Sequence, residues 1–119
     1  MKSRSCKAKG RRHQQAVCEA LVSVRSDLEK DDVRSTAMGQ TGEDILFSPL
    51  ARRIYPYSIE CKNVEKLNIW EAIRQAEANA GKYTPAVAFS KNNEKIWIAI
   101  PLEDFLRFFK NKDGNNEQG

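Results

Sequence analysis

Three residues of types used in metal-dependent phosphate chemistry lie close together in the middle of the chain. Asp44 begins one short strand-like segment, and Glu60 and Lys62 stand two residues apart in the next. Side chains two apart on a strand share a face, so Glu60 and Lys62 are expected side by side. Two carboxylates and a strand carbonyl would suit Mg²⁺, and a lysine can hold a water and offset charge developing on a phosphate. An edge strand with one solvated face would show the same alternation, so both interpretations stay open.

The other reactive side chains favour few other chemistries. Three cysteines without CxxC spacing predict neither a disulfide framework nor a zinc site, and His13 is the only histidine. Cys61 alternates away from Glu60 and Lys62, so we expect it to pack in the core. This cysteine usage fits a reducing intracellular compartment. The longest apolar run, residues 96–100, is too short for a membrane helix, and no secretory signal is expected.

Positive charge is concentrated at the N-terminus. Residues 1–12 contain six Lys and Arg residues and no acid, so the net charge of +4 leaves −2 for the rest of the chain. Such a basic arm predicts contact with a polyanion, while a solvated tail and a targeting peptide are the alternatives. No base-reading module is recognisable, so phosphate contacts are expected to dominate. The residues expected to make them are Lys7, Lys9, Arg11, Arg12, Arg34, Arg52 and Arg53.

Hydrophobic periodicity and turn signals predict the elements that position these residues. We expect helices at residues 11–28, 69–80 and 102–110, and strands near 33 and at 44–48, 57–62, 85–91 and 95–100. Asn68 is expected to cap the second helix, whereas residues 49–56 are expected to form a loop. The last helix is expected to turn four apolar residues inward, namely Leu102, Phe105, Leu106 and Phe109.

The order of these elements predicts an α/β fold with a mixed central sheet flanked by helices. The helices at 11–28 and 69–80 can cover the two faces of the sheet. Residues 1–10 are expected to be a flexible basic arm, residues 11–110 the domain, and the Gly- and Asn-rich residues 111–119 a disordered tail.

The segments Gly42-Glu43-Asp44-Ile45 and Ile59-Glu60-Cys61-Lys62-Asn63 resemble the core of the PD-(D/E)xK nuclease superfamily. That superfamily places an Asp on one strand and Asp/Glu-x-Lys on the adjacent one, within a restriction-endonuclease-like αβββαβ core. The expected order contains this core, with an extra C-terminal strand and helix. The stretch 34–63 is also similar to archaeal-type Holliday junction resolvases, and the whole chain to small phage-encoded nucleases. Glu43 stands where a proline is usual.

The resemblance implies a Mg²⁺-dependent endonuclease, with Mn²⁺ as a possible substitute, that leaves 5′-phosphates. It implies that Asp44, Glu60 and the backbone carbonyl of Cys61 hold the metal, while Lys62 orients the attacking water. Related nucleases often carry a Gln on the helix after the lysine strand, which makes Gln75 a candidate; a solvated helix position is the alternative. Junction resolvases also carry a Glu on the first helix, where the candidates are Gln14, Gln15 and Glu19, of which only Glu19 is an acid.

The expected function is therefore structure-selective cleavage of branched DNA such as Holliday junctions, in the cytoplasm of a bacterium or a phage-infected cell. Trp97 and Phe108 are expected to form an apolar patch suited to a homodimer, or else to be covered by helices of the same chain. A two-fold dimer would match a junction with two symmetric cleavage sites. The alternatives are a homing- or restriction-like sequence-specific endonuclease, a DNA-end nuclease and a non-catalytic DNA-binding module.

Overall fold

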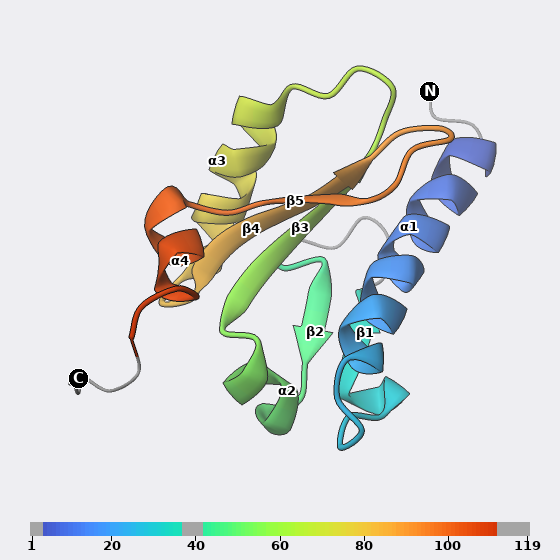
Figure 1. Ribbon diagram of the computed structural model, residues 1–119. Helices are drawn as coiled ribbons and strands as arrows, with labels where there is room; N and C mark the ends of the chain where they lie inside the picture. The colour runs from blue at the N-terminus through green and yellow to red at the C-terminus, as the bar shows by residue number, and fades with distance from the viewer. Residues whose placement is uncertain (1–3, 37–41, 112–119) are drawn as a thin grey trace.

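A mixed three-stranded sheet stands at the centre of the computed structural model, which describes residues 4–36 and 42–111 (Figure 1). Strand β3 (Tyr57–Asn63) runs parallel to β4 (Thr84–Ser90), and β5 (Trp97–Ala99) pairs antiparallel to β4. Strands β1 (Val33–Ser35) and β2 (Ile45–Phe47) form a separate antiparallel pair. The two sheets meet at Asp44, whose N–H donates to the carbonyl of Ile59 at 3.3 Å. The expected α/β class with a mixed sheet is confirmed.

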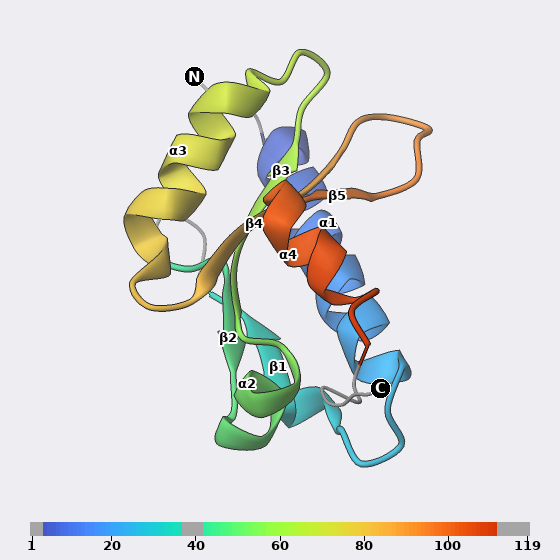
Figure 2. The ribbon, with the colours of Figure 1, turned by 60° about the vertical axis from the view of Figure 1, so that its left-hand side comes forward.

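Two helices cover the opposite faces of this sheet, as expected (Figure 2). Helix α1 (Arg4–Ser23) packs through Val17 and Cys18 against one face, and α3 (Ile69–Ala80) packs through its alanines against the other. Strand alternation divides β4 between them, because Ala88 faces α1 while Val87 faces α3. The apolar residues of β3 face α1, so its polar residues face α3.

Helix α3 forms where the sequence predicts it. The Asn68 side chain accepts a hydrogen bond from the N–H of Glu71 at 3.1 Å, and the helix ends at Gly81, whose φ of +57° favours glycine. The buried positions are Ala72, Ala76 and Ala80, so α3 can lie close to the sheet. Ile69 and Ile73 pack beside these alanines but are only half-buried.

Helix α1 begins earlier and ends earlier than predicted. Residues 4–10, expected to be a flexible arm, form its first turns, since lysine, arginine and alanine favour helices without any apolar periodicity. Residues 1–3 lie outside the described residues. The helix ends at Ser23, so Val24 is exposed, and the buried Leu28 belongs to the connection that follows. A short 3₁₀ turn, η1 (Lys30–Asp32), then leads into β1.

The expectation of a loop at residues 49–56 is wrong, because most of this segment forms α2 (Pro49–Ile54). The Ser48 hydroxyl accepts a hydrogen bond from the N–H of Ala51 at 3.1 Å, and Pro49 occupies the first turn. A serine followed by proline is a recognised helix start. The prolines at 49 and 56 therefore bracket a helix.

The expected orientation of the last helix is also wrong. Helix α4 (Leu102–Arg107) ends three residues early, and the four residues expected to face inward are 48–70% exposed. Its buried residue is Asp104, whose Oδ1 accepts a hydrogen bond from the Thr84 hydroxyl at 3.3 Å. An apolar stripe predicts which helix face prefers burial, but not whether the same chain covers it. Of the expected tail, only Asn111 is described.

Candidate active site

Asp44 is held at the point where the two sheets meet. Its Oδ2 accepts a hydrogen bond from the N–H of Cys61 at 2.7 Å, and its own N–H donates to Ile59, also on β3. Its carbonyl accepts from the N–H of Thr36 at 3.0 Å. Backbone contacts on both sides therefore fix this carboxylate beside the middle of β3, which brings it to the Glu60–Lys62 segment as the sequence predicts.

Glu60 and Lys62 lie side by side on the α3 face of β3. The Nζ of Lys62 is 3.6 Å from Oε2 of Glu60, and their side chains are 29% and 12% exposed respectively. Ser58, on the same face, donates to the carbonyl of Asn79 on α3 at 3.3 Å. The expected same-face placement is confirmed, but this face lies beneath a helix, unlike the solvated face of an edge strand.

The two carboxylates lie in an environment that disfavours their shared negative charge. Burial is the main cause that raises the pKa of Asp44, against the Cys61 N–H and the charges of Lys62 and His13. Burial also raises the pKa of Glu60, the charge of Asp44 raises it further, and Lys62 and Asn79 oppose the shift. A bound cation would relieve this repulsion.

The donor atoms available here fit a hard divalent cation. Asp44 and Glu60 provide carboxylate oxygens, and the N–H and carbonyl of one strand residue point to the same edge, so the Cys61 carbonyl faces the edge where Asp44 lies. Oxygen ligands without sulfur or imidazole suit Mg²⁺. No cluster of three or more His, Cys, Asp or Glu residues suited to a metal occurs within residues 4–36 and 42–111. A cation would thus rely on two acids, backbone oxygen and ligands from water or substrate.

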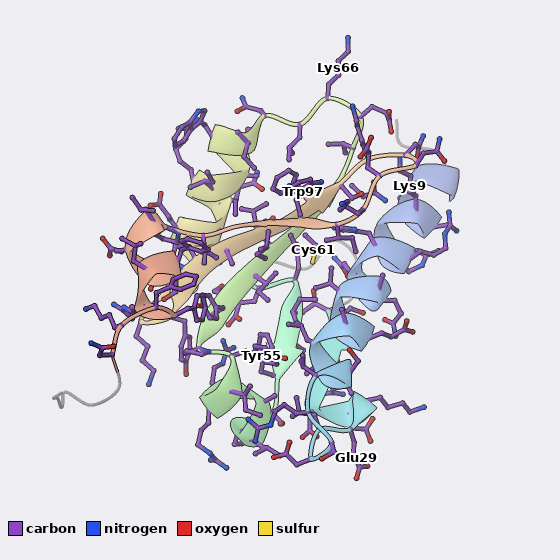
Figure 3. All side chains as sticks on the ribbon, viewed as in Figure 1. Lys9, Glu29, Tyr55, Cys61, Lys66 and Trp97 are labelled. Atoms are coloured by element: carbon purple, nitrogen blue, oxygen red, sulfur yellow. The ribbon has the colours of Figure 1, made fainter. Side chains whose placement is uncertain are left out.

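Cys61 itself packs away from the site, as expected. Its side chain contacts the core between the sheet and α1, and Figure 3 shows the sulfur beside β3. Burial raises the pKa of this thiol strongly, with the charge of Asp44 adding to the shift. The thiol therefore stays protonated and is a poor nucleophile.

Gln75 lines the same pocket as Lys62. This pocket of about 210 Å³ lies between the end of β3, the following loop and α3, and it also contains Lys66 and Glu71. Lys66 projects outward from that loop (Figure 3). The structure thus brings the candidate Gln75 to the lysine end of the site. The pocket's other two charged residues were missed in the sequence, where a loop lysine and a first-turn glutamate look ordinary.

On the first helix, Gln14 instead of Glu19 faces the interior. Glu19 is exposed, and Gln15 accepts a hydrogen bond from Ser35 at 3.3 Å. Gln14 is 7% exposed, and its Oε1 is without a hydrogen-bond partner among the described residues. The side-chain oxygen of Asn63, just after Lys62, is likewise buried and unpartnered within the described part of the chain.

His13 contributes to the electrostatic environment of Asp44, a role that was not expected from the sequence. Its ring is 5% exposed, and Nε2 lies 2.9 Å from the carbonyl of Ala88 on β4. The charge of its protonated form would lower the pKa of Asp44. The signal was present, since His13, Gln14, Val17 and Cys18 occupy one stripe with four-residue spacing.

The basic residues expected to contact DNA fall into two groups. Arg52 is held within the protein, because it donates to both oxygens of Glu43 at 2.9 and 3.2 Å and to the carbonyl of Tyr57, and its guanidinium stacks on Phe47 and Tyr83. These internal contacts, with 18% of the side chain exposed, argue against its expected contact with phosphate. Lys9 pairs with Glu65 at 3.6 Å. The others are exposed, namely Lys7, Arg11, Arg12, Arg34 and Arg53.

Comparison with protein-family models, with curated proteins and with solved structures finds no match for this chain. Among the described helices, none combines the length and the apolar character needed to cross a bilayer.

Proposed function

We propose that the protein is a metal-dependent endonuclease of the PD-(D/E)xK type that hydrolyses phosphodiester bonds in DNA. The observation that carries the proposal is the side chain of Asp44 bonded to the backbone N–H between Glu60 and Lys62. Residues up to 18 positions apart in the sequence, one just before β2 and two on β3, thereby form one charged cluster. The order α1-β1-β2-β3-α3-β4, with α2 inserted, also agrees with an αβββαβ core.

The chain's own residues would divide the work of hydrolysis. Asp44, Glu60 and the Cys61 carbonyl would hold Mg²⁺, which when bound supplies a Lewis acid and lowers the pKa of a water. Lys62 donates to the attacking water and offsets negative charge on the phosphate. The Cys61 N–H fixes the Asp44 carboxylate, and burial under α3 limits the motion of Glu60. Gln75 donates to the phosphate or the water from across the pocket.

The surface chemistry supports DNA as the substrate and its shape as the basis of selection. Lys7 and Arg11 are exposed one turn apart on α1, so the basic segment presents a row of cations on a helix. Cations bind phosphates without reading sequence. We propose branched DNA, such as a four-way junction, because the described residues form a single α/β unit that contains no separate base-reading module.

A cleavage assay tests this function. The protein is incubated with Mg²⁺ and either a four-way junction or a linear duplex of matching sequence, with Lys62→Ala and the exposed-lysine control Lys30→Ala in parallel. We expect paired nicks in the junction, no cutting by Lys62→Ala and normal cutting by Lys30→Ala. Equal cutting of both DNAs would remove the structural selectivity. Binding without cutting in Mg²⁺ or Mn²⁺ would contradict the endonuclease and favour a DNA-binding module.

A further inference from the structure

Strand β5 has the sequence of a buried strand but lies at the edge of the sheet. Residues 96–100 are the longest apolar run in the chain, a pattern typical of strands that are covered on both faces. The structure places β5 outside β4, where its outer edge has no strand partner among the described residues. Trp97 and Ile98 are each 55% exposed. An edge strand whose exposed side chains are apolar can pair with another strand.

Both faces of β5 carry exposed apolar side chains, and they continue onto α4. Trp97 shares a pocket with Ile69 on the α3 side. Ile98 alternates with Ala99 and pairs with Ala88, so it faces the α1 side. Helix α4 follows directly at the end of β5 (Figures 1 and 2). We call this region the β5–α4 surface; its exposed members are Trp97, Ile98, Leu102, Phe105, Leu106, Phe108 and Phe109.

We propose that a second copy of this chain covers the β5–α4 surface, by antiparallel pairing of β5 with β5 across a two-fold axis. Two identical strands related by an axis perpendicular to the sheet run antiparallel and present the same edge to each other. Their register must be centred on one residue, and Ile98 is the middle of β5. The two three-stranded sheets would then form one continuous sheet.

Charge and area favour a second copy over other occupants. Lys95 precedes the strand and Glu103 follows it, so antiparallel pairing brings opposite charges of the two copies toward each other at both ends. The exposed parts of the seven side chains amount to about 700 Å², against roughly 600–1,000 Å² per partner in a standard interface. Residues 112–119 include no large apolar side chain that could cover the surface instead.

The pairing has a consequence for the candidate active site, which rests on the proposed function. Lys62 pairs with Phe89, and Phe89 pairs with Trp97, next to the central Ile98. A perpendicular two-fold axis keeps both α3 faces on one side, so both active sites would open on the same side. Five strand spacings separate the two Lys62 residues, which is about 24 Å across the sheet. Such a dimer presents two cleavage centres to one branched DNA.

The test is the oligomeric state of the full chain in solution. Sedimentation velocity at tens of micromolar is expected to give a dimer of the 13.6 kDa chain. Ile98→Lys places a charge at the centre of the pairing twice per dimer and is expected to weaken association at least about a hundredfold. The control Val24→Lys changes another exposed apolar residue, just after α1, and should remain dimeric.

Hydrogen exchange on the unmodified protein provides a second measurement. The backbone amides of residues 96–100 are expected to become more protected as concentration rises, while those of α1 stay unchanged. A wild-type monomer, or an Ile98→Lys protein that remains dimeric with unchanged exchange at residues 96–100, would overturn the proposal. Lys62→Ala should still form dimers, so failure of the nuclease and failure of the dimer can be told apart.

Discussion

The α3 face of β3 and the β5–α4 surface reverse the usual distribution of residues in opposite ways. At the first, the carboxylates of Asp44 and Glu60 lie largely inside the protein beside Lys62. At the second, aromatic residues such as Phe108, 64% exposed, lie outside. Buried charge and exposed apolar area both cost free energy unless something compensates.

Each of the two regions lacks a different partner. The buried carboxylates repel each other, and a cation with a phosphate substrate would balance them. The exposed side chains of the second region are apolar, so a second apolar surface would cover them. The first region is fixed by internal hydrogen bonds such as that from the Cys61 N–H to Asp44, as expected of a preorganised site, whereas the second is open, as expected of an interface.

The largest effect is expected at the buried cluster. Glu60→Gln keeps the size of the side chain but removes a charge proposed to hold the metal, so cleavage of a four-way junction should fall about a thousandfold or more. Quantifying nicked product against the wild type measures this. Glu77→Gln, at an exposed position of α3, is the matched control and should cut normally. Cleavage by Glu60→Gln within tenfold of the wild type would remove Glu60 from the site.

A second prediction concerns Arg52, whose contacts join α2 to the start of β3 and to the residues before β2. Arg52→Ala would leave Glu43 and the Tyr57 carbonyl without their donor and remove the stacking on Phe47 and Tyr83. We expect the free energy of unfolding to fall by about 2–3 kcal/mol in urea denaturation. Arg53→Ala, its exposed neighbour, should change stability by less than about 0.5 kcal/mol. Equal effects would show that the internal contacts of Arg52 are not stabilising.

The sequence predicts the arrangement of the site better than its surroundings. Alternation along residues 57–62 correctly places Glu60 and Lys62 on one face and Cys61 on the other, because strand geometry is local. The contacts of Arg52 depend on Glu43 and Tyr83, which only the folded chain brings together, and no local pattern reveals them. For His13, the local spacing indicates a buried helix position, but its hydrogen-bond acceptor, the carbonyl of Ala88, lies on a distant strand.

At the fold level, errors arise where a local signal has two outcomes. Pro49 is compatible with a loop or with the first turn of a helix, and the Ser48 cap decides for the helix. The spacing of Leu102, Phe105, Leu106 and Phe109 predicts a helix correctly, but its expected burial depends on what lies opposite. Because the described part of the chain leaves that face open, sequence periodicity alone gives the wrong environment.

A third prediction uses the raised pKa values of Asp44 and Glu60 in the absence of divalent cations. A carboxyl whose pKa is raised by folding binds its proton more tightly in the folded state, so stability falls as the pH rises from the ordinary pKa of 4.5 for Glu60 through the folded value. Glu60→Gln removes its own contribution and the repulsion it exerts on Asp44. Urea denaturation across this range should therefore show a smaller loss of stability for Glu60→Gln than for the wild type. Parallel curves would show that folding does not raise the pKa of Glu60.

The smallest effect on folding is expected at the β5–α4 surface. Phe108→Ser removes a large apolar side chain that is already exposed, so the free energy of unfolding measured at low protein concentration should change by less than about 0.5 kcal/mol. Ile45→Ala, at a fully buried position, should cost about 2–5 kcal/mol in the same assay. A large loss for Phe108→Ser would mean that this side chain is covered within its own chain.

Cation binding at the cluster formed by Asp44, Glu60 and Lys62 tests the proposed metal site directly. Calorimetric titration with Mn²⁺ compares the wild type with Asp44→Asn, which keeps an oxygen able to accept from the Cys61 N–H but loses the charge. We expect saturable binding by the wild type that weakens at least about tenfold in Asp44→Asn. Equal affinity in the two proteins, or no binding by either with or without DNA, would contradict it.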